Sequence, residues 1–132
     1  MSISVIEDVP SAEEYVSLRI KAGLWPKQLE AAKKGLANSL YAVTIREKEK
    51  LVAMGRVIGD GGCFFEIVDI AVDPKCQGQG LGKKVMMYIE KYISENAHTD
   101  SYVSMIANTP LFYEKFGYRC VMPTMQGMGK RL

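Results

Sequence analysis

Apolar and polar residues alternate along this chain with two periods, one typical of strands and the other of helices. A half-buried strand alternates at every second residue and a central strand is continuously apolar, whereas a helix repeats its apolar positions every three to four residues. We expect six strands and a weaker seventh, at residues 2–6, 40–46, 51–58, 63–72, 101–106, 118–122 and 127–132. We expect four helices, at residues 11–22, 27–37, 81–97 and 109–116. This order predicts an α+β sheet with helices packed against it.

Turn and cap residues separate these elements. Ser11 is a typical helix N-cap residue, and Gly23 and Pro26 end the segment that follows it. The polar link at 47–50 and the glycine-rich link at 59–62 suit hairpin turns. We therefore expect the strands on either side of each link to pair antiparallel.

The composition is that of one folded domain covering residues 1–132. With 48% hydrophobic and 24% charged residues, the chain is too apolar for a disordered segment and long enough to bury its own core. The net charge of +2 gives no global basic field, so we expect no nucleic-acid partner. No apolar run approaches the roughly 20 residues that a membrane helix needs, so we expect no membrane contact.

Cysteine and histidine usage indicates the compartment and argues against a metal centre. The three cysteines are scattered and form no C-x-x-C pair, as in proteins of a reducing compartment. The amino terminus has an acidic pair and a proline where a signal peptide needs a basic start and an apolar run, so we expect a cytoplasmic protein. His98 is the only histidine and lies in a polar stretch, so we expect no metal ion.

Three glycines in five positions form the most informative motif. The segment Gln77–Gly82 follows a buried strand and begins an amphipathic helix. Because its glycines have no Cβ atoms, the backbone N–H groups can face a common point. Lys83 and Lys84 oppose the helix dipole unless an anion is bound there. The sequence thus predicts an anion cradle. The alternative is that the glycines only permit tight turning and close helix packing, with the lysines solvated.

Other glycine motifs fit this segment less well. A dinucleotide-binding loop has Gly-x-Gly-x-x-Gly with an acidic residue about 20 positions later in a repeated βαβ unit, whereas this chain has Gly78-x-Gly80-x-Gly82 and no second unit. A Walker loop needs Ser or Thr after Gly-Lys, and here a second lysine follows.

Two motifs together resemble the GNAT N-acetyltransferase superfamily. Gln77-x-x-Gly80-x-Gly82 after a strand ending at 70–74 resembles its acetyl-CoA-binding motif, and residues 111–118 resemble its F-Y-x-K-x-G-F/Y segment. The resemblance implies the GNAT acyl-CoA N-acyltransferase fold, with a mixed, twisted central sheet of six to seven strands flanked by about four helices. It implies that this sheet is splayed at residues 66–72, where the pantetheine arm of the cofactor enters.

The resemblance also implies which residues bind acetyl-CoA. Main-chain groups would contact the pantetheine at Ile70, Ala71 and Val72. The pyrophosphate would lie on Gln77, Gly78, Gln79, Gly80, Leu81 and Gly82, with Lys83 beside them. Many members carry an asparagine that reaches the cofactor five to seven residues before the tyrosine. Asn108 has that spacing to Tyr113, although Pro110 alters the local backbone.

Acetyl transfer to an amine needs a group that removes a proton from the ammonium and a group that protonates or stabilises the thiolate. By resemblance Glu66 is the base, because it precedes Gln77 by the eleven residues that separate base and motif in family members. Asp69 competes for this role, although strand alternation places it on the opposite face unless a bulge re-aims it. Either carboxylate could instead be satisfied by backbone amides or by Arg56 on the neighbouring strand.

Tyr113 is the general acid by resemblance, since the tyrosine of this motif lies beside the thioester sulfur and a phenol is protonated at neutral pH. It could alternatively be a core aromatic. The resemblance also implies that Trp25, Tyr41 and the early helices form the wall of the acceptor pocket, although Trp25 is equally explained by packing.

The sequence predicts an N-acetyltransferase that transfers acetyl from acetyl-CoA to a primary amine of a small molecule, by direct attack in a ternary complex. The alternatives are a protein or peptide N-acetyltransferase and a non-catalytic acyl-CoA-binding sensor, which would not need Glu66 and Tyr113. A homodimer fits the family, in which dimers are common. The net charge of +2 gives no steering toward a cationic amine, so the acceptor stays open.

Overall fold

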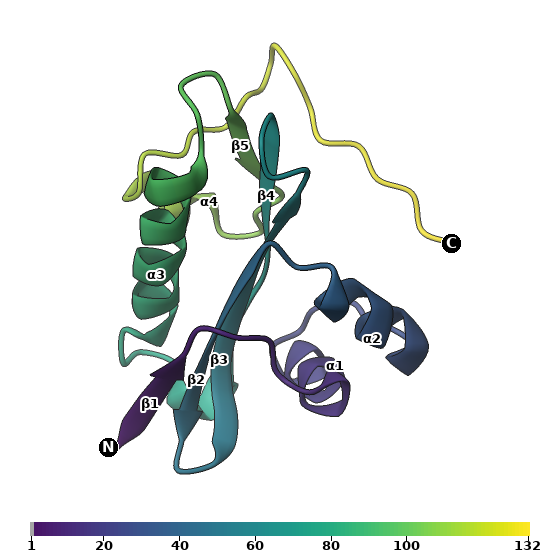
Figure 1. The fold of residues 1–132 in the computed structure, drawn as a ribbon, viewed down its shortest axis with the longest axis vertical. Coiled ribbons are helices and arrows are strands. Elements are labelled where there is room, and N and C mark those ends of the chain that lie inside the picture. The colour runs from purple at the N-terminus through teal and green to yellow at the C-terminus, as the bar shows by residue number, and fades with distance from the viewer. Residues whose placement is uncertain (1) are drawn as a thin grey trace.

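Helices cover both faces of one twisted sheet in the computed structural model, which describes residues 2–132 (Figure 1). The strands are β1 (Ile3–Ile6), β2 (Tyr41–Glu47), β3 (Lys50–Gly59), β4 (Phe64–Val72) and β5 (Tyr102–Met105). The helices are α1 (Ala12–Lys21), α2 (Leu29–Ala37), α3 (Leu81–Asn96) and α4 (Pro110–Glu114), with a 3₁₀ turn at Pro74–Cys76. The predicted α+β class and the four predicted helices are confirmed.

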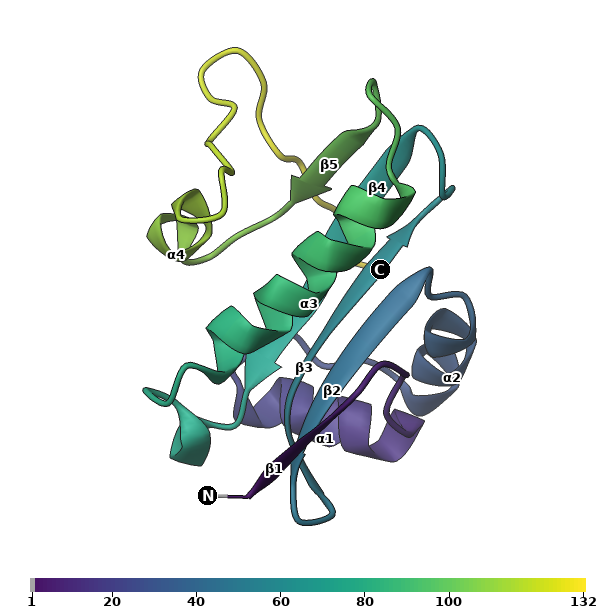
Figure 2. The same cartoon turned by 60° about the vertical axis from the view of Figure 1, so that its left-hand side comes forward.

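The sheet is mixed and follows the order of the chain, β1-β2-β3-β4-β5. The first three pairings are antiparallel, as the two predicted hairpins require, and β4 pairs with β5 in parallel. The parallel pairing follows from α3, which carries the chain from the end of β4 back to the start of β5 (Figure 2).

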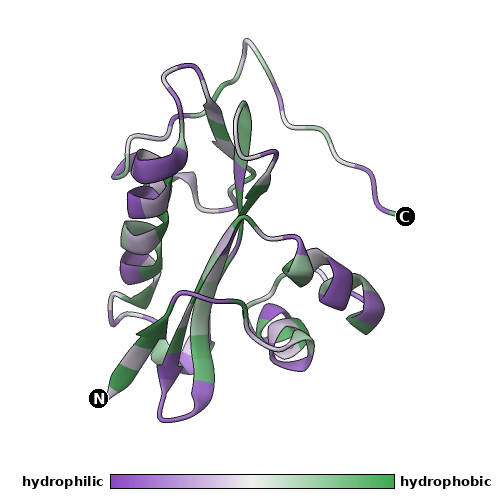
Figure 3. Ribbon diagram, viewed as in Figure 1, coloured by the Kyte–Doolittle hydropathy of each residue, from purple (hydrophilic) through white to green (hydrophobic). Residues whose placement is uncertain are grey.

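The apolar sides of the predicted helices pack against the sheet in two hydrophobic cores, one on each face of the sheet. On one face, α3 packs Leu81, Val85 and Ile89 against the central strands, much of which is hydrophobic (Figure 3). Gly55 of β3 permits this approach, because a Cβ atom there would lie 2.6 Å from Val85 and 2.9 Å from Ile89. On the other face, α1 and α2 cover Ala71 and parts of β3 with a second, smaller core. This smaller layer forms one wall of the site described below.

The two predicted carboxy-terminal strands, 118–122 and 127–132, are wrong. Every residue from 119 to 132 is exposed, so the alternating side chains of this tail have no core to pack against. Its backbone makes local turn bonds instead, such as Met125 N–H to the carbonyl of Val121, and Pro123 has no N–H for a strand ladder. The sheet therefore has five strands rather than six to seven.

A β-bulge interrupts β4 where the sequence places two carboxylates in an apolar run. Arg56 is opposite Val68 and Met54 is opposite Ala71, so Asp69 and Ile70 together face Gly55. Asp69 has a φ of +61°, in the left-handed region that aspartate tolerates better than most residues. The extra residue turns Asp69 toward α1, and Ile70 toward α3.

The sheet also opens at this bulge. The pairing of β4 with β5 ends at Ile67 and Met105, so residues 68–72 continue with no strand on that edge. The opening lies within the predicted splay at 66–72. In the described part of the chain, no helix combines the length and the apolar character needed to cross a bilayer.

Candidate active site

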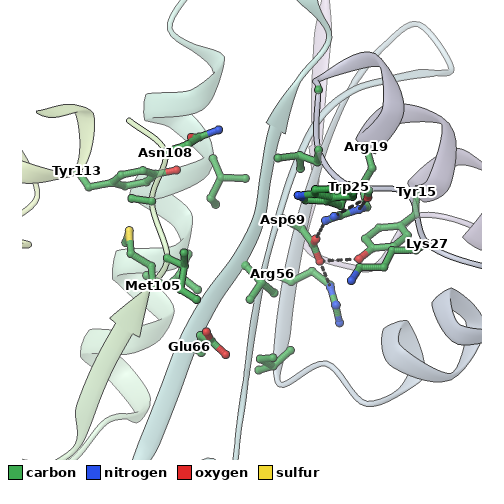
Figure 4. A pocket seen from close by; sticks show the side chains of 18 of the residues that line it. Tyr15, Arg19, Trp25, Lys27, Arg56, Glu66, Asp69, Met105, Asn108 and Tyr113 are labelled. Carbon is green, nitrogen blue, oxygen red and sulfur yellow. Dashed lines mark hydrogen bonds and ion pairs between the residues drawn. The ribbon is translucent and has the colours of Figure 1, made fainter. Parts of the chain in front are cut away.

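A cavity of about 590 Å³ lies where β4 and β5 separate, in the range of small-molecule sites. Its walls come from β4, from the segment that follows β5, from α1 and the loop between α1 and α2, and from the carboxy-terminal tail through Arg131. Figure 4 shows Tyr113 and Asn108 at one end of this cavity and Trp25, Arg19 and Lys27 at the other. Segments distant in the sequence therefore build one site.

Glu66 is the uncommitted carboxylate of this cavity. It lies on β4 opposite Ile58 and is half-buried in the cavity wall. Its side chain makes no hydrogen bond or ion pair within residues 2–132. A carboxylate with unoccupied lone pairs can accept a proton or a hydrogen bond from a bound molecule.

Asp69 also lines the cavity, but its oxygens are occupied. It accepts hydrogen bonds from Arg19 Nη1, from Arg56 Nε at 2.8 Å and from the Tyr15 hydroxyl at 2.8 Å (Figure 4). Its side chain is 4% exposed, and those of Arg19 and Arg56 are 9% and 10% exposed. Of the alternatives open from the sequence, the bulge that re-aims Asp69 and its pairing with Arg56 both occur.

Sequence reasoning missed Arg19 and the hydrogen bond from Tyr15 to Asp69. Both residues lie on the buried face of α1, one turn apart, and Arg19 also donates from Nε and Nη2 to the carbonyl of Trp25 at 3.0 and 2.8 Å. Arg19 therefore ties the α1–α2 loop to β4. The signal was an arginine four residues after an inward tyrosine, since a cation on an apolar helix face needs a buried counterion such as Asp69.

Tyr113 is buried at the opposite end of the cavity, with its ring against Phe112 at a centroid distance of 4.9 Å. Burial raises the pKa of this phenol above its ordinary value, so it keeps its proton at neutral pH and can donate it. Asn108 lies in the segment between β5 and α4 and lines the same end of the cavity (Figure 4). The two predicted residues are thus brought together.

Trp25 lines the cavity as the resemblance implied, whereas Tyr41 does not. The Tyr41 ring stacks on Tyr92 at 4.7 Å and its hydroxyl donates to Glu7, on the side of the sheet that packs against α3. The pocket-wall role of Tyr41 is therefore wrong, because a residue at the start of β2 is two strands away from the opening.

The glycine loop has the backbone of an anion-binding site. Gly78 and Gly80 have φ values of +81° and +80°, and Gly80 is the N-cap of α3, which no side chain in the described chain caps. The first-turn N–H groups of this 16-residue helix therefore remain open to an anion. Lys83 is exposed in that first turn.

Local packing shows which glycines serve which purpose. A Cβ atom at Gly82 would lie 3.5 Å from the Phe112 ring, so this glycine lets α3 lie beside α4. Around Gly78 and Gly80 there is open space, so there the backbone conformation and not packing needs glycine. Gln77 donates from Nε2 to the carbonyl of Val72 at 3.3 Å and ties the loop to the end of β4.

The free edge of β4 and this loop suit the two polar parts of acetyl-CoA. The edge of β4 beyond Ile67 has no strand beside it, so an extended amide chain such as pantetheine can bind its backbone groups by strand addition. The loop and the helix terminus offer N–H groups for a diphosphate. The loop at 77–82 comes shortly after Ile70, Ala71 and Val72 in the chain. The pantetheine and the diphosphate of one acetyl-CoA molecule can therefore be bound at the same time.

Comparison with known proteins gives the family. The acetyltransferase (GNAT) domain family matches residues 37–120, which include β2 to α4 and both motifs. This chain belongs to the GNAT acetyltransferase superfamily. Members of the superfamily use acetyl-CoA, and the predicted membership is confirmed.

Individual GNAT proteins extend this similarity. A crystal structure of a Staphylococcus aureus protein, described as of unknown function and a probable acetyltransferase, is 46% identical, covers 99% of this chain and 100% of its own, and has a TM-score of 0.96. A predicted acetyltransferase from Clostridium acetobutylicum, solved with acetyl-CoA, shares the fold with a TM-score of 0.72 over 96% of both chains at 16% identity.

A curated plant relative matches only in part. The chloroplastic GCN5-related N-acetyltransferase 2 of Arabidopsis thaliana is 31% identical over 63% of this chain and 32% of its own length. This chain spans about half the length of the other curated relatives that it matches.

Proposed function

We propose that this GNAT protein transfers acetyl from acetyl-CoA to a primary amine of a small molecule, by direct attack within a ternary complex. The observation that carries the proposal is that one cavity holds an uncommitted carboxylate, Glu66, and a buried phenol, Tyr113. A cavity of about 590 Å³ suits a small acceptor, and the three free cysteines suit a cytoplasmic enzyme.

Each of these residues has one task in the transfer. Bound acetyl-CoA supplies the thioester carbonyl carbon that the amine nitrogen attacks. Glu66 accepts the proton that the ammonium loses, which frees the nitrogen lone pair for the new C–N bond. Tyr113 donates its proton to the sulfur as the C–S bond breaks, and the second amine proton, released through solvent, restores the phenol. Asp69 is a positioning residue in this scheme, because its oxygens already bind Arg19 and Arg56.

The experiment that tests the proposal follows release of free CoA thiol with a panel of small primary amines, beside calorimetry of acetyl-CoA binding. We expect saturable binding and amine-dependent thiol release. If acetyl-CoA bound but no amine of the panel caused thiol release, transfer to small amines would be contradicted. If a peptide acceptor then caused thiol release, the protein would be a protein or peptide acetyltransferase. If the peptide caused no release either, the protein would be a non-catalytic acyl-CoA sensor. Absence of binding would overturn all of these alternatives.

Gly80→Val tests the glycine loop without adding a clash, because nothing lies within 4 Å of the position of its Cβ. A β-branched residue is strained at a φ of +80°, so the loop should leave the conformation that directs its N–H groups. We expect the Kd for acetyl-CoA to rise by about tenfold, for a strain of 1–2 kcal/mol. Gly129→Val, in the exposed tail, is the matched control. An unchanged Kd for Gly80→Val would show that the loop does not grip the diphosphate.

Tyr113→Phe tests the acid role. The variant keeps the ring packing and loses only the hydroxyl, so we expect kcat to fall by about 10- to 100-fold while the Kd for acetyl-CoA is unchanged. Because burial raises the pKa of Tyr113, the alkaline decline of the wild-type rate should lie above about pH 10 and be absent from the variant. Tyr102→Phe, on the exposed edge of β5, is the control. Equal kcat values for Tyr113→Phe and wild type would remove Tyr113 from the mechanism.

A further inference from the structure

We propose that the acceptor amine carries an anionic group, a carboxylate or a phosphate, at the end of the molecule away from the reacting nitrogen. This inference rests on the proposed acetyl transfer and names the class of its acceptor. It comes from the charges that the fold gathers around the cavity, which the net charge of the chain does not reveal.

Cationic side chains outnumber carboxylates in the cavity wall. The charged residues that line it are the cations Arg19, Lys27, Arg56 and Arg131 and the carboxylates Glu66 and Asp69. Their formal sum at neutral pH is +2, gathered around a cavity of about 590 Å³. A cleft lined mostly by one sign of charge focuses the potential and concentrates ligands of the opposite sign.

Part of this positive charge lies in the cluster of Arg19, Arg56 and Asp69, where one carboxylate pairs with two guanidinium groups. Arg19 and Arg56 both bind it, and their side chains are only 9% and 10% exposed. One positive charge therefore remains uncompensated within a nearly buried cluster. Arg56 uses Nε and Nη1 for Asp69, Gly35 and Ser39, and its Nη2 donates no hydrogen bond within residues 2–132. An anion in the cavity would offset this excess charge.

Lys27 and Arg131 add two further cations at the same end. Neither forms an ion pair within the described chain, which leaves both charges available to a ligand. The guanidinium group of Arg131 stacks on the Trp25 ring at 4.0 Å and so brings the tail over the α1–α2 loop. Four separate segments, α1, the α1–α2 loop, β3 and the tail, thus contribute cations to the cavity wall.

The positions of the charges orient the acceptor. Arg19 and Lys27 lie at the end of the cavity opposite Tyr113 (Figure 4). Glu66, the uncommitted carboxylate, can receive the ammonium group, while the far end of the molecule meets the cations. A diamine or polyamine would instead place a second positive charge against this wall, where like charges repel.

The test compares amines of equal chain length that differ in the group at the far end. The probes are 5-aminopentanoate, 4-aminobutyl phosphate, 5-aminopentanol and 1,5-diaminopentane, assayed by CoA thiol release and by calorimetric binding to the protein saturated with CoA. We expect kcat/KM for the better of the two anionic amines to exceed that for the amino alcohol by about tenfold and that for the diamine by more. The two anionic probes distinguish carboxylate from phosphate. The preference should shrink as salt is added.

Lys27→Met and Arg131→Met separate the charges from the catalytic groups. We expect each to reduce the ratio of kcat/KM for the anionic amine to kcat/KM for the amino alcohol about threefold. Lys34→Met, an exposed lysine of α2 that does not line the cavity, should leave this ratio and both kcat/KM values unchanged.

The outcomes separate this inference from the proposed function. Equal or better use of the diamine would overturn the anionic acceptor and leave acetyl transfer standing. If none of the probes released thiol, calorimetry would still decide the inference, because tighter binding of the anionic amines supports it and equal binding overturns it.

Discussion

Glu66→Gln is expected to lower kcat by at least about 100-fold, the contribution of a general base to a proton-transfer step. Glutamine has nearly the same size and cannot accept the ammonium proton, so the half-buried position on β4 should remain filled. Without this base the variant can use only acceptor molecules that are already neutral, so its rate should rise with pH more steeply than that of the wild type. Steady-state kinetics from pH 5 to 9, with acetyl-CoA saturating, measure both effects.

The control for this variant is Glu95→Gln, at the exposed end of α3. We expect Glu95→Gln to match the wild type, and the Kd for acetyl-CoA to be unchanged in both variants, because Glu66 faces the acceptor cavity and not the glycine loop. A kcat for Glu66→Gln within threefold of wild type, with the same pH profile, would assign the base role to another group or to solvent.

Asp69→Asn is expected to cost about 3 kcal/mol in the free energy of unfolding, because two nearly buried guanidinium groups lose their shared counterion. Asparagine tolerates a φ of +61° as well as aspartate does, so the substitution removes the charge and leaves the bulge in place. Urea denaturation of the two proteins at neutral pH gives the difference. The result also bears on the cavity wall, since Arg19 would lose its bond to β4.

Asp100→Asn, in the exposed turn before β5, is the matched control and should stay within 0.5 kcal/mol of wild type, as surface substitutions do. The double variant Asp69→Asn with Arg19→Gln should recover part of the loss, because it removes one of the unpaired charges. A loss below about 1 kcal/mol for Asp69→Asn would show that water or other groups compensate both arginines.

Local patterns were enough to predict most of the elements. The period of α3 was readable because Leu81, Val85 and Ile89 must reach the sheet from one helix face. The glycine loop could be predicted because positive φ values, as at Gly78 and Gly80, strongly favour a residue without a Cβ atom. The tail beyond 118 was misread, because an alternating pattern forms a strand only where a partner strand and a core are available.

The residues of the site could be predicted only in part from the sequence, because the geometry of the site depends on contacts between distant segments. Glu66 and Tyr113 were named from motifs, and the cavity contains both. The spacing of Glu66 and Asp69 could not reveal that a bulge brings Asp69 into the same cavity wall as Glu66, and no local pattern paired Arg19 with a residue 50 positions away.

By itself, the sequence determined the class of fold, the order of its elements and a backbone able to bind an anion, because each follows from short-range periodicity or from the φ preference of glycine. The family came from the resemblance of two motifs to a known superfamily. Only the tertiary structure decided that the sheet has five strands, that Asp69 is paired with Arg19 and Arg56, and that cations outnumber carboxylates in the cavity wall. Charge balance at a site is a sum over side chains that converge in space, and the same chain with a net charge of +2 could have distributed it evenly over its surface.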